Sequence, residues 1–263
     1  MGDVRKIYIV GNWKMNFTPG EASLYLHKLS KKVTPGKDIQ IIVAPSMISL
    51  QTLSLQVNRR EFKLAAQNIN GRDFGAFTGE VSAAQLRGIV DYALVGHSER
   101  RYLFYEHDKI TREKVAAALR NRIVPILCIG ETLNERENGE TDMVIRDQLI
   151  GGLSEVVKED MDKVIVAYEP VWAISSNKDA KLATPDEVED AVRQVRKHVA
   201  EVYGEKVAEA LPVLYGGSIN NSNAGTYLRI EGVDGLLMGG ASLIADEFSS
   251  IVDIAKEVRD ERD

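Results

Sequence analysis

The chain has 263 residues, of which 44% are hydrophobic and 27% are charged, and its 33 basic and 39 acidic residues give a net charge of -6. This composition excludes a largely disordered chain and supplies enough apolar surface for a sizeable core. It argues against binding to DNA or RNA, because no sustained basic run is present to neutralise a polymer's phosphates. A small phosphorylated ligand stays possible, since backbone dipoles bind phosphate without a basic surface.

The single cysteine and the first residues bear on location. Cys128 has no partner for an internal disulfide, and its apolar neighbours predict a buried strand. The segment from Met1 to Lys6 lacks the apolar stretch of a secretory signal, and no apolar run approaches the roughly 20 residues that a membrane span needs. We therefore expect a cytoplasmic protein that does not enter a membrane.

Short apolar runs recur along the whole chain and predict eight strands. They cover residues 7–10, 39–44, 62–66, 92–95, 124–129, 164–167, 213–215 and 235–238. Most of these runs are continuous rather than alternating, which is typical of parallel strands covered by helices.

Segments with helical spacing lie between the strands. They cover residues 22–33, 111–121, 142–158, 185–203 and 248–259. The helix over 185–203 has the clearest start, because Thr184 and Glu187 form a capping box and Pro185 takes the first helical position. Gly204 is the predicted C-cap.

The alternation of strand and helix predicts an α/β fold. No linker or abrupt change in composition divides the chain, so we expect one domain over residues 1–263. Eight such units fit either a closed (β/α)8 TIM barrel of roughly 250 residues or an open doubly wound sheet. The number of units favours the barrel.

In a parallel barrel the active site is built by the residues that follow the strands. Asn12 and Lys14 follow the first strand, His97 follows the fourth, and Glu169 follows the sixth beside two aromatic residues. Each has an ordinary structural alternative, since a strand-end carboxylate often forms a salt bridge, a lone histidine is often structural and most lysines lie on the surface. As functional groups, Glu169 is a candidate base, His97 a hydrogen-bond donor and Lys14 an electrostatic stabiliser.

Small residues follow the last two strands, at Ser218 and at Gly239 and Gly240. Barrels often bind phosphate with backbone N–H groups at these two loops. We expect no metal and no cofactor, because the four histidines and the cysteine lack zinc-ligand spacing and no nucleotide-binding glycine motif is present.

Several segments together resemble the triosephosphate isomerase family. They are residues 11–16, 95–101, 167–174, 215–218 and 237–243, which occur in the family's order and span nearly the whole chain. The segment from Gln67 to Glu80 is similar to the family's dimer-forming loop, so the resemblance implies a homodimer in which Thr78 reaches the neighbour's active site.

The resemblance also implies a reaction and roles for its residues. The family interconverts dihydroxyacetone phosphate and D-glyceraldehyde 3-phosphate through an enediol or enediolate, in glycolysis and gluconeogenesis. Glu169 matches its base and His97 its neutral electrophile. Lys14 and Asn12 match groups that bind substrate and stabilise its charge. The matching phosphate ligands are Ser175, Ser218, Gly239 and Gly240, and the supporting residues are Glu99, which orients Lys14, and Ser98. Cys128 lies near the site by the same likeness.

The chain departs from the family in the lid that covers the site. Residues 175–180 form a longer, more polar tip without glycine, and residues 181–183 stand where the family has its hinge. We expect slower or less complete closure, because a longer tip loses more entropy on ordering. A smaller departure is Tyr105, where the family commonly has glycine.

Two other functions remain open from the sequence. A barrel acting on a larger sugar phosphate would explain the glycines but not the combination of Lys14, His97 and Glu169. A noncatalytic scaffold would explain the altered lid tip but not those three residues.

Overall fold

The computed structural model describes residues 5–34, 36–174 and 181–262. Its eight strands form a closed parallel barrel in which each strand pairs with the next and the first pairs with the eighth. The strands are β1 (Ile7–Asn12), β2 (Ile39–Ala44), β3 (Phe62–Ala66), β4 (Tyr92–Val95), β5 (Val124–Ile129), β6 (Ile165–Tyr168), β7 (Val213–Tyr215) and β8 (Gly235–Met238). The predicted TIM barrel is confirmed, and the open doubly wound sheet is excluded by the pairing of β1 with β8.

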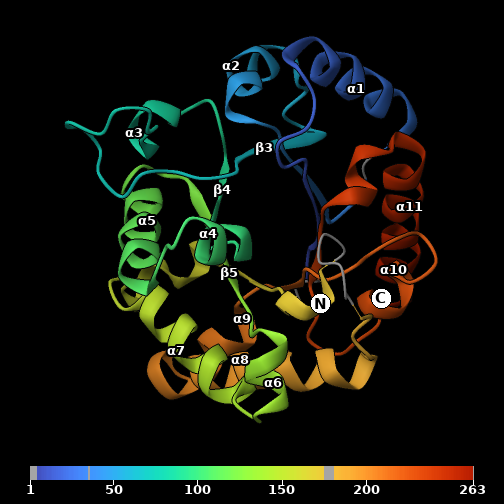
Figure 1. The fold of residues 1–263 in the computed structure, drawn as a ribbon. Coiled ribbons are helices and arrows are strands. Elements are labelled where there is room, and N and C mark those ends of the chain that lie inside the picture. The colour runs from blue at the N-terminus through green and yellow to red at the C-terminus, as the bar shows by residue number, and fades with distance from the viewer. Residues whose placement is uncertain (1–4, 35, 175–180, 263) are drawn as a thin grey trace.

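Helices surround the barrel (Figure 1). The longer ones are α1 (Pro19–Lys32), α2 (Met47–Gln56), α5 (Asp108–Arg120), α7 (Thr141–Leu153), α8 (Pro185–Tyr203) and α11 (Ala245–Glu261). Short helices are α3 (Ala83–Leu86), α4 (Ser98–Leu103), α6 (Leu133–Glu137), α9 (Glu205–Ala210) and α10 (Ala224–Leu228), with 3-10 turns η1 (Lys158–Lys163), η2 (Val171–Ala173) and η3 (Gly240–Leu243).

The capping signals in the sequence set the start of α8. Thr184 accepts a hydrogen bond from the Glu187 N–H and Glu187 bonds back to the Thr184 N–H, with Pro185 in the first turn. Gly204 ends the helix with a φ of 93°, a conformation that glycine adopts without strain. The predicted bounds of this helix are confirmed.

Two apolar layers hold the barrel together. One fills the space between the strands and the helices. The other fills the barrel itself and consists of Val10, Ile42, Ala44, Ala65, Leu94, Ile126, Cys128, Ile165, Ala167, Leu214 and Leu237. Because side chains alternate along a strand, every second residue of each strand belongs to the inner layer.

Candidate active site

The same alternation decides which residues face the mouth of the barrel. Two residues beyond Val10, Ala65 and Ala167 in the inner layer stand Asn12, Gln67 and Glu169. Two residues beyond Leu214 and Leu237 stand Gly216 and Gly239, which leave space there. The chain therefore continues the inner layer with polar groups on some strands and with room for a ligand on others.

Glu169 and His97 meet at this mouth from the ends of β6 and β4, which both pair with β5. The Glu169 side chain is 3% exposed, and its Oε1 lies 3.4 Å from His97 Nε2. Its Oε2 is buried and has no hydrogen-bond partner among the residues that the structure describes. A buried carboxylate oxygen that no donor occupies can accept a proton from a substrate carbon.

His97 is the N-cap of the helix α4. Its Nδ1 accepts a hydrogen bond from the Glu99 backbone N–H at 3.2 Å. An Nδ1 that accepts carries no proton, so the neutral ring carries its proton on Nε2. The cap thereby turns an N–H donor toward Glu169 and the mouth.

Lys14 has a strained backbone, with a φ of 51°. Such a left-handed conformation costs a residue with a side chain about 1 to 3 kcal/mol and persists only where neighbours impose it. Asn12 Oδ1 accepts the Lys14 N–H at 3.1 Å, and Gln67 Nε2 donates to the carbonyls of Lys14 and Ala44, both at 2.8 Å. These side chains hold the turn that directs Lys14.

The Lys14 ammonium is anchored by Glu99. Its Nζ lies 2.6 Å from Glu99 Oε1. Ser98, which lies between His97 and Glu99, is buried. The loops after β1 and β4 are thus joined across the mouth by an ion pair.

Glycines make space around these groups. A Cβ on Gly216 would lie 2.6 Å from Glu169 Cγ, closer than real atoms approach. A Cβ on Gly239 would contact the Lys14 Cε at 3.4 Å. Gly240 is the first residue of η3, so its N–H has no acceptor within that turn.

Of the phosphate ligands expected from the sequence, one has its backbone N–H bonded elsewhere and one lies outside the described residues. The Ser218 N–H donates to the Ala173 carbonyl at 2.9 Å, so it would have to leave that partner to bind a phosphate. Ser175 lies outside the described residues, as does the whole tip over 175–180. Gly239 and Gly240 lie beside Lys14 and at the start of η3 respectively.

The sequence did not reveal a second buried carboxylate, Glu131, next to the site. It is fully buried and accepts hydrogen bonds from Tyr168 Oη at 3.1 Å and from Trp172 Nε1 at 2.9 Å. Arg136 pairs with it at 3.3 Å and stacks on the Trp172 ring at 4.6 Å. These contacts hold the segment that follows Glu169. No local sequence pattern indicates them, because they join Glu131 and Arg136, before and within α6, to residues of β6 and η2.

Cys128 lies in the inner layer below the site. Burial and then the negative charge of Glu169 raise the pKa of its thiol well above the usual range. The thiol is therefore neutral beside the carboxylate and packs as an apolar group.

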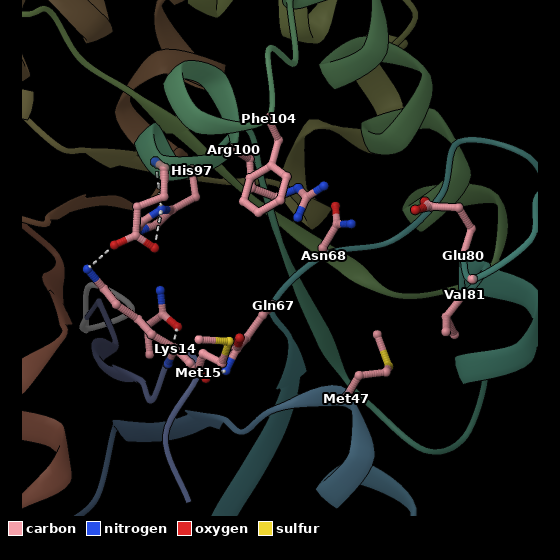
Figure 2. A pocket seen from close by; sticks show the side chains of 13 residues that line it. Lys14, Met15, Met47, Gln67, Asn68, Glu80, Val81, His97, Arg100 and Phe104 are labelled. Carbon is pink, nitrogen blue, oxygen red and sulfur yellow. Dashed lines mark hydrogen bonds and ion pairs between the residues drawn. The ribbon is translucent and has the colours of Figure 1, made fainter.

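A cavity of about 470 Å³ opens beside Lys14 and His97. Met15 and Phe104 line it as well, and Figure 2 shows Met47, Glu80 and Val81 across the cavity from Lys14 and His97. Within the described part of the chain, no helix is long and apolar enough to cross a membrane and no cluster of three or more possible metal ligands occurs.

Comparison with known proteins agrees with this geometry. The family model of triosephosphate isomerase matches residues 7–255. The chain belongs to the triosephosphate isomerase family. It is 41% identical to the triosephosphate isomerase of Clostridium tetani over 250 residues, covering 95% of this chain and 96% of that one. It is also 41% identical to those of Endomicrobium trichonymphae and Chloroherpeton thalassium, covering 96% of this chain and 100% of each relative.

Proposed function

We propose that the chain interconverts dihydroxyacetone phosphate and D-glyceraldehyde 3-phosphate, as an isomerase of glycolysis and gluconeogenesis. The observation that carries this proposal is the arrangement at the mouth: the Glu169 carboxylate has its Oε1 3.4 Å from His97 Nε2, and its Oε2 has no hydrogen-bond partner among the described residues. Family membership over residues 7–255 supports the same reaction.

The reaction needs one proton to move between two adjacent carbons. Glu169 takes the proton from the carbon beside the substrate carbonyl and returns it to the neighbouring carbon. His97 Nε2–H donates to the substrate oxygens and transfers protons between them as the enediol or enediolate forms. No atom is gained or lost, so neither oxidant nor cofactor is required.

The remaining groups bind and stabilise. Lys14 and Asn12 stand at the end of β1, where their N–H groups offset the negative charge of the intermediate. Backbone N–H groups at Ser218, Gly239 and Gly240 bind the phosphate and so fix the reacting carbon against Glu169. The Ser218 N–H joins this set after it leaves the Ala173 carbonyl.

The direct test is an assay of the purified chain with dihydroxyacetone phosphate, in the presence of a metal chelator and without added cofactor. Glu169→Gln keeps the size of the side chain and removes the base, so kcat should fall by about 10² to 10⁴-fold. Glu205→Gln, an exposed carboxylate at the start of α9, is the matched control and should keep full activity. Thermal unfolding of all three proteins checks their folding.

Three results would redirect this conclusion. Turnover of a longer sugar phosphate but not of the triose would favour another phosphate-binding barrel. No turnover of any sugar phosphate by a folded wild-type protein would favour a scaffold. Turnover that survives Glu169→Gln would assign the base elsewhere.

We also propose a homodimer formed through the loop from Gln67 to Glu80. This loop projects from the barrel between β3 and α3 (Figure 1). Large apolar side chains are exposed on it and near the cavity, with Phe74 84%, Met15 97% and Phe104 61% exposed. A cluster of this kind is typical of a protein interface. The cavity beside Lys14 would receive the Thr78 tip of the second copy.

Met15→Arg tests the dimer, since it removes an apolar contact and adds a charge at an interface. In a monomer this nearly fully exposed side chain would tolerate the change. Leu55→Arg, at the end of α2 with 81% exposure, is the control. Sedimentation velocity should show dimers for wild type and Leu55→Arg and monomers for Met15→Arg. A monomeric wild type would refute the dimer.

The proposed location is the cytoplasm, in keeping with a reaction of central metabolism and with Cys128 as a buried free thiol. Fractionation of the source cells with an activity assay would test it.

A further inference from the structure

A buried tyrosine outside the reacting groups reaches the proposed phosphate loop. Tyr25 belongs to α1 and is 7% exposed, and its hydroxyl donates to the Ser242 carbonyl at 2.5 Å. Ser242 lies in η3, directly after β8, and η3 leads into α11. Figure 1 shows α1 beside α11, so the hydrogen bond joins two neighbouring elements of the outer ring to the end of the barrel.

Aromatic contacts fix the Tyr25 ring. Its centroid lies 5.1 Å from that of Trp13 at an angle of 77°, and it stacks on Phe17 at 5.1 Å. Trp13 stands between Asn12 and Lys14 in the chain. These contacts pack the ring, and the hydroxyl adds the hydrogen bond to the Ser242 carbonyl.

Ser242 in turn fixes the peptide bond between Gly239 and Gly240. Both its N–H, at 2.9 Å, and its hydroxyl, at 2.6 Å, donate to the Gly239 carbonyl. In a trans peptide the carbonyl and the following N–H point in opposite directions. Holding the Gly239 carbonyl toward Ser242 therefore turns the Gly240 N–H away from Ser242, and Gly239 itself lies beside Lys14.

The Ser242 carbonyl depends on Tyr25. Ser242 is fully buried, and within the described residues the Tyr25 hydroxyl is the donor found at its carbonyl. A buried carbonyl that loses its donor makes the folded state less stable. The turn can recover this stability only by reorienting the carbonyl toward another donor or toward water.

We propose that Tyr25 is a positioning residue for phosphate binding, in which its hydroxyl holds η3 so that the Gly240 N–H faces the substrate phosphate. This inference rests on the proposed phosphate role of Gly239 and Gly240. Tyr25 touches neither the substrate nor Glu169, so its effect belongs to substrate affinity rather than to the proton transfer.

Tyr25→Phe is the discriminating variant, because it removes one oxygen and keeps the ring packed. Tyr203→Phe is its matched control: the Tyr203 hydroxyl also donates to buried backbone, at the Leu153 carbonyl at 2.8 Å and the Val156 carbonyl at 3.1 Å, at the end of α8 away from the mouth. Calorimetric titration with inorganic phosphate and the values of KM and kcat are measured for wild type and both variants, with thermal unfolding as a check.

Tyr25→Phe should raise the phosphate Kd and KM by about three- to tenfold, the effect of one positioning hydrogen bond. Its kcat should stay near that of wild type, because lost uniform binding raises KM alone. Tyr203→Phe should change the melting temperature to a similar degree and leave Kd and KM unchanged. A Tyr25→Phe protein whose phosphate Kd shifts no more than that of Tyr203→Phe would overturn the proposal.

The phosphate titration separates this proposal from the proposed reaction. If the wild type binds phosphate but does not isomerise the triose, the proposed reaction is wrong. The phosphate Kd of Tyr25→Phe then still tests the positioning role. A wild type that does not bind phosphate would overturn the positioning role. Should Tyr25→Phe fail to fold, Ser242→Ala removes the hydroxyl bond to the same peptide, and an unchanged phosphate Kd there would equally overturn it.

Discussion

Two buried carboxylates at the two ends of the barrel, Glu169 and Asp234, differ in how they are bonded. At the mouth, Glu169 keeps one oxygen without a hydrogen bond among the described residues. At the opposite end, Asp234 precedes β8 and accepts from the Val213 N–H and from Arg196 Nη2, both at 3.0 Å. Its backbone N–H and carbonyl are also bonded, to Val213 and Tyr8.

Backbone strain does not follow the same division, because Asp38 and Arg122, which precede β2 and β5 at the opposite end, have φ values of 61° and 60°. Lys14 holds a left-handed conformation at the mouth, where Gln67 and Asn12 impose it. What differs is the bonding: the satisfied Asp234 at one end stabilises the barrel, while the incompletely bonded Glu169 at the other remains available for chemistry. Substitutions at the mouth should therefore change activity, and substitutions at the opposite end should change stability.

His97→Asn is expected to have the largest effect. Asparagine still caps α4 by accepting the Glu99 N–H, but it is too short to supply the Nε2–H donor. We expect kcat/KM to fall by about 10² to 10³-fold, the usual effect of losing one such donor, with the melting temperature nearly unchanged. Comparable losses of stability and activity would contradict the division between the two ends.

Gly216→Ala should come next. The new Cβ would lie 2.6 Å from Glu169 Cγ, and the flexible carboxylate side chain is the group that moves. A displacement of about 1 Å can cost roughly 10²-fold in rate, so kcat should fall to that degree. Thermal unfolding should stay close to that of wild type, and an active Gly216→Ala protein would show that Glu169 tolerates the shift.

Gly235→Ala is the counterpart at the opposite end. It should have a smaller effect, and on stability rather than on activity. Its Cβ would lie 2.1 Å from the Tyr8 carbonyl oxygen, which belongs to the paired backbone of β1 and cannot rotate away. We expect a loss of about 1 to 3 kcal/mol in the free energy of unfolding. Urea denaturation measures it, and kcat of the folded fraction should be unchanged.

The strands were predictable from the sequence because their apolar runs are continuous. Residues 39–44 and 124–129 form strands with the predicted bounds, whereas β1 continues two residues further, since Gly11 and Asn12 still pair with β2. The helix α2 was missed because exposed Ile48 and Leu55 obscure its faces. The helix predicted over 142–158 ends at Leu153, soon after two adjacent glycines, which are poor helix formers.

The candidate site was predictable where a residue directly follows an apolar strand. Continuing the alternation beyond Ala65 would have indicated Gln67 as a mouth residue as well. The contacts of Glu131 and the conformation of Lys14 were not predictable, because they depend on loops that meet only in the fold. Tyr105 has a φ of 56°, which gives a physical reason for the glycine common at that place in the family.

The pH dependence of stability extends this comparison to a third carboxylate. Glu106 is buried beside the mouth, where its Oε1 lies 2.6 Å from Arg100 Nη2 and 2.5 Å from Lys114 Nζ. Burial alone raises the pKa of Glu106, but the hydrogen bonds and charges of Arg100 and Lys114 outweigh it, so this pKa lies below its ordinary value.

A lowered pKa in the folded state means that the unfolded chain binds the proton more readily. The stabilisation from Glu106 is therefore complete above the ordinary glutamate pKa of about 4.3 and is lost as the pH falls through the lower folded value. Glu106→Gln should lower the free energy of unfolding at neutral pH and flatten its decline between about pH 5 and pH 3. Urea denaturation across this range measures both slopes, and parallel curves for the two proteins would show that Glu106 contributes nothing to acid unfolding. Glu106 would then no longer serve as an example of a carboxylate that stabilises the fold because its charge is paired.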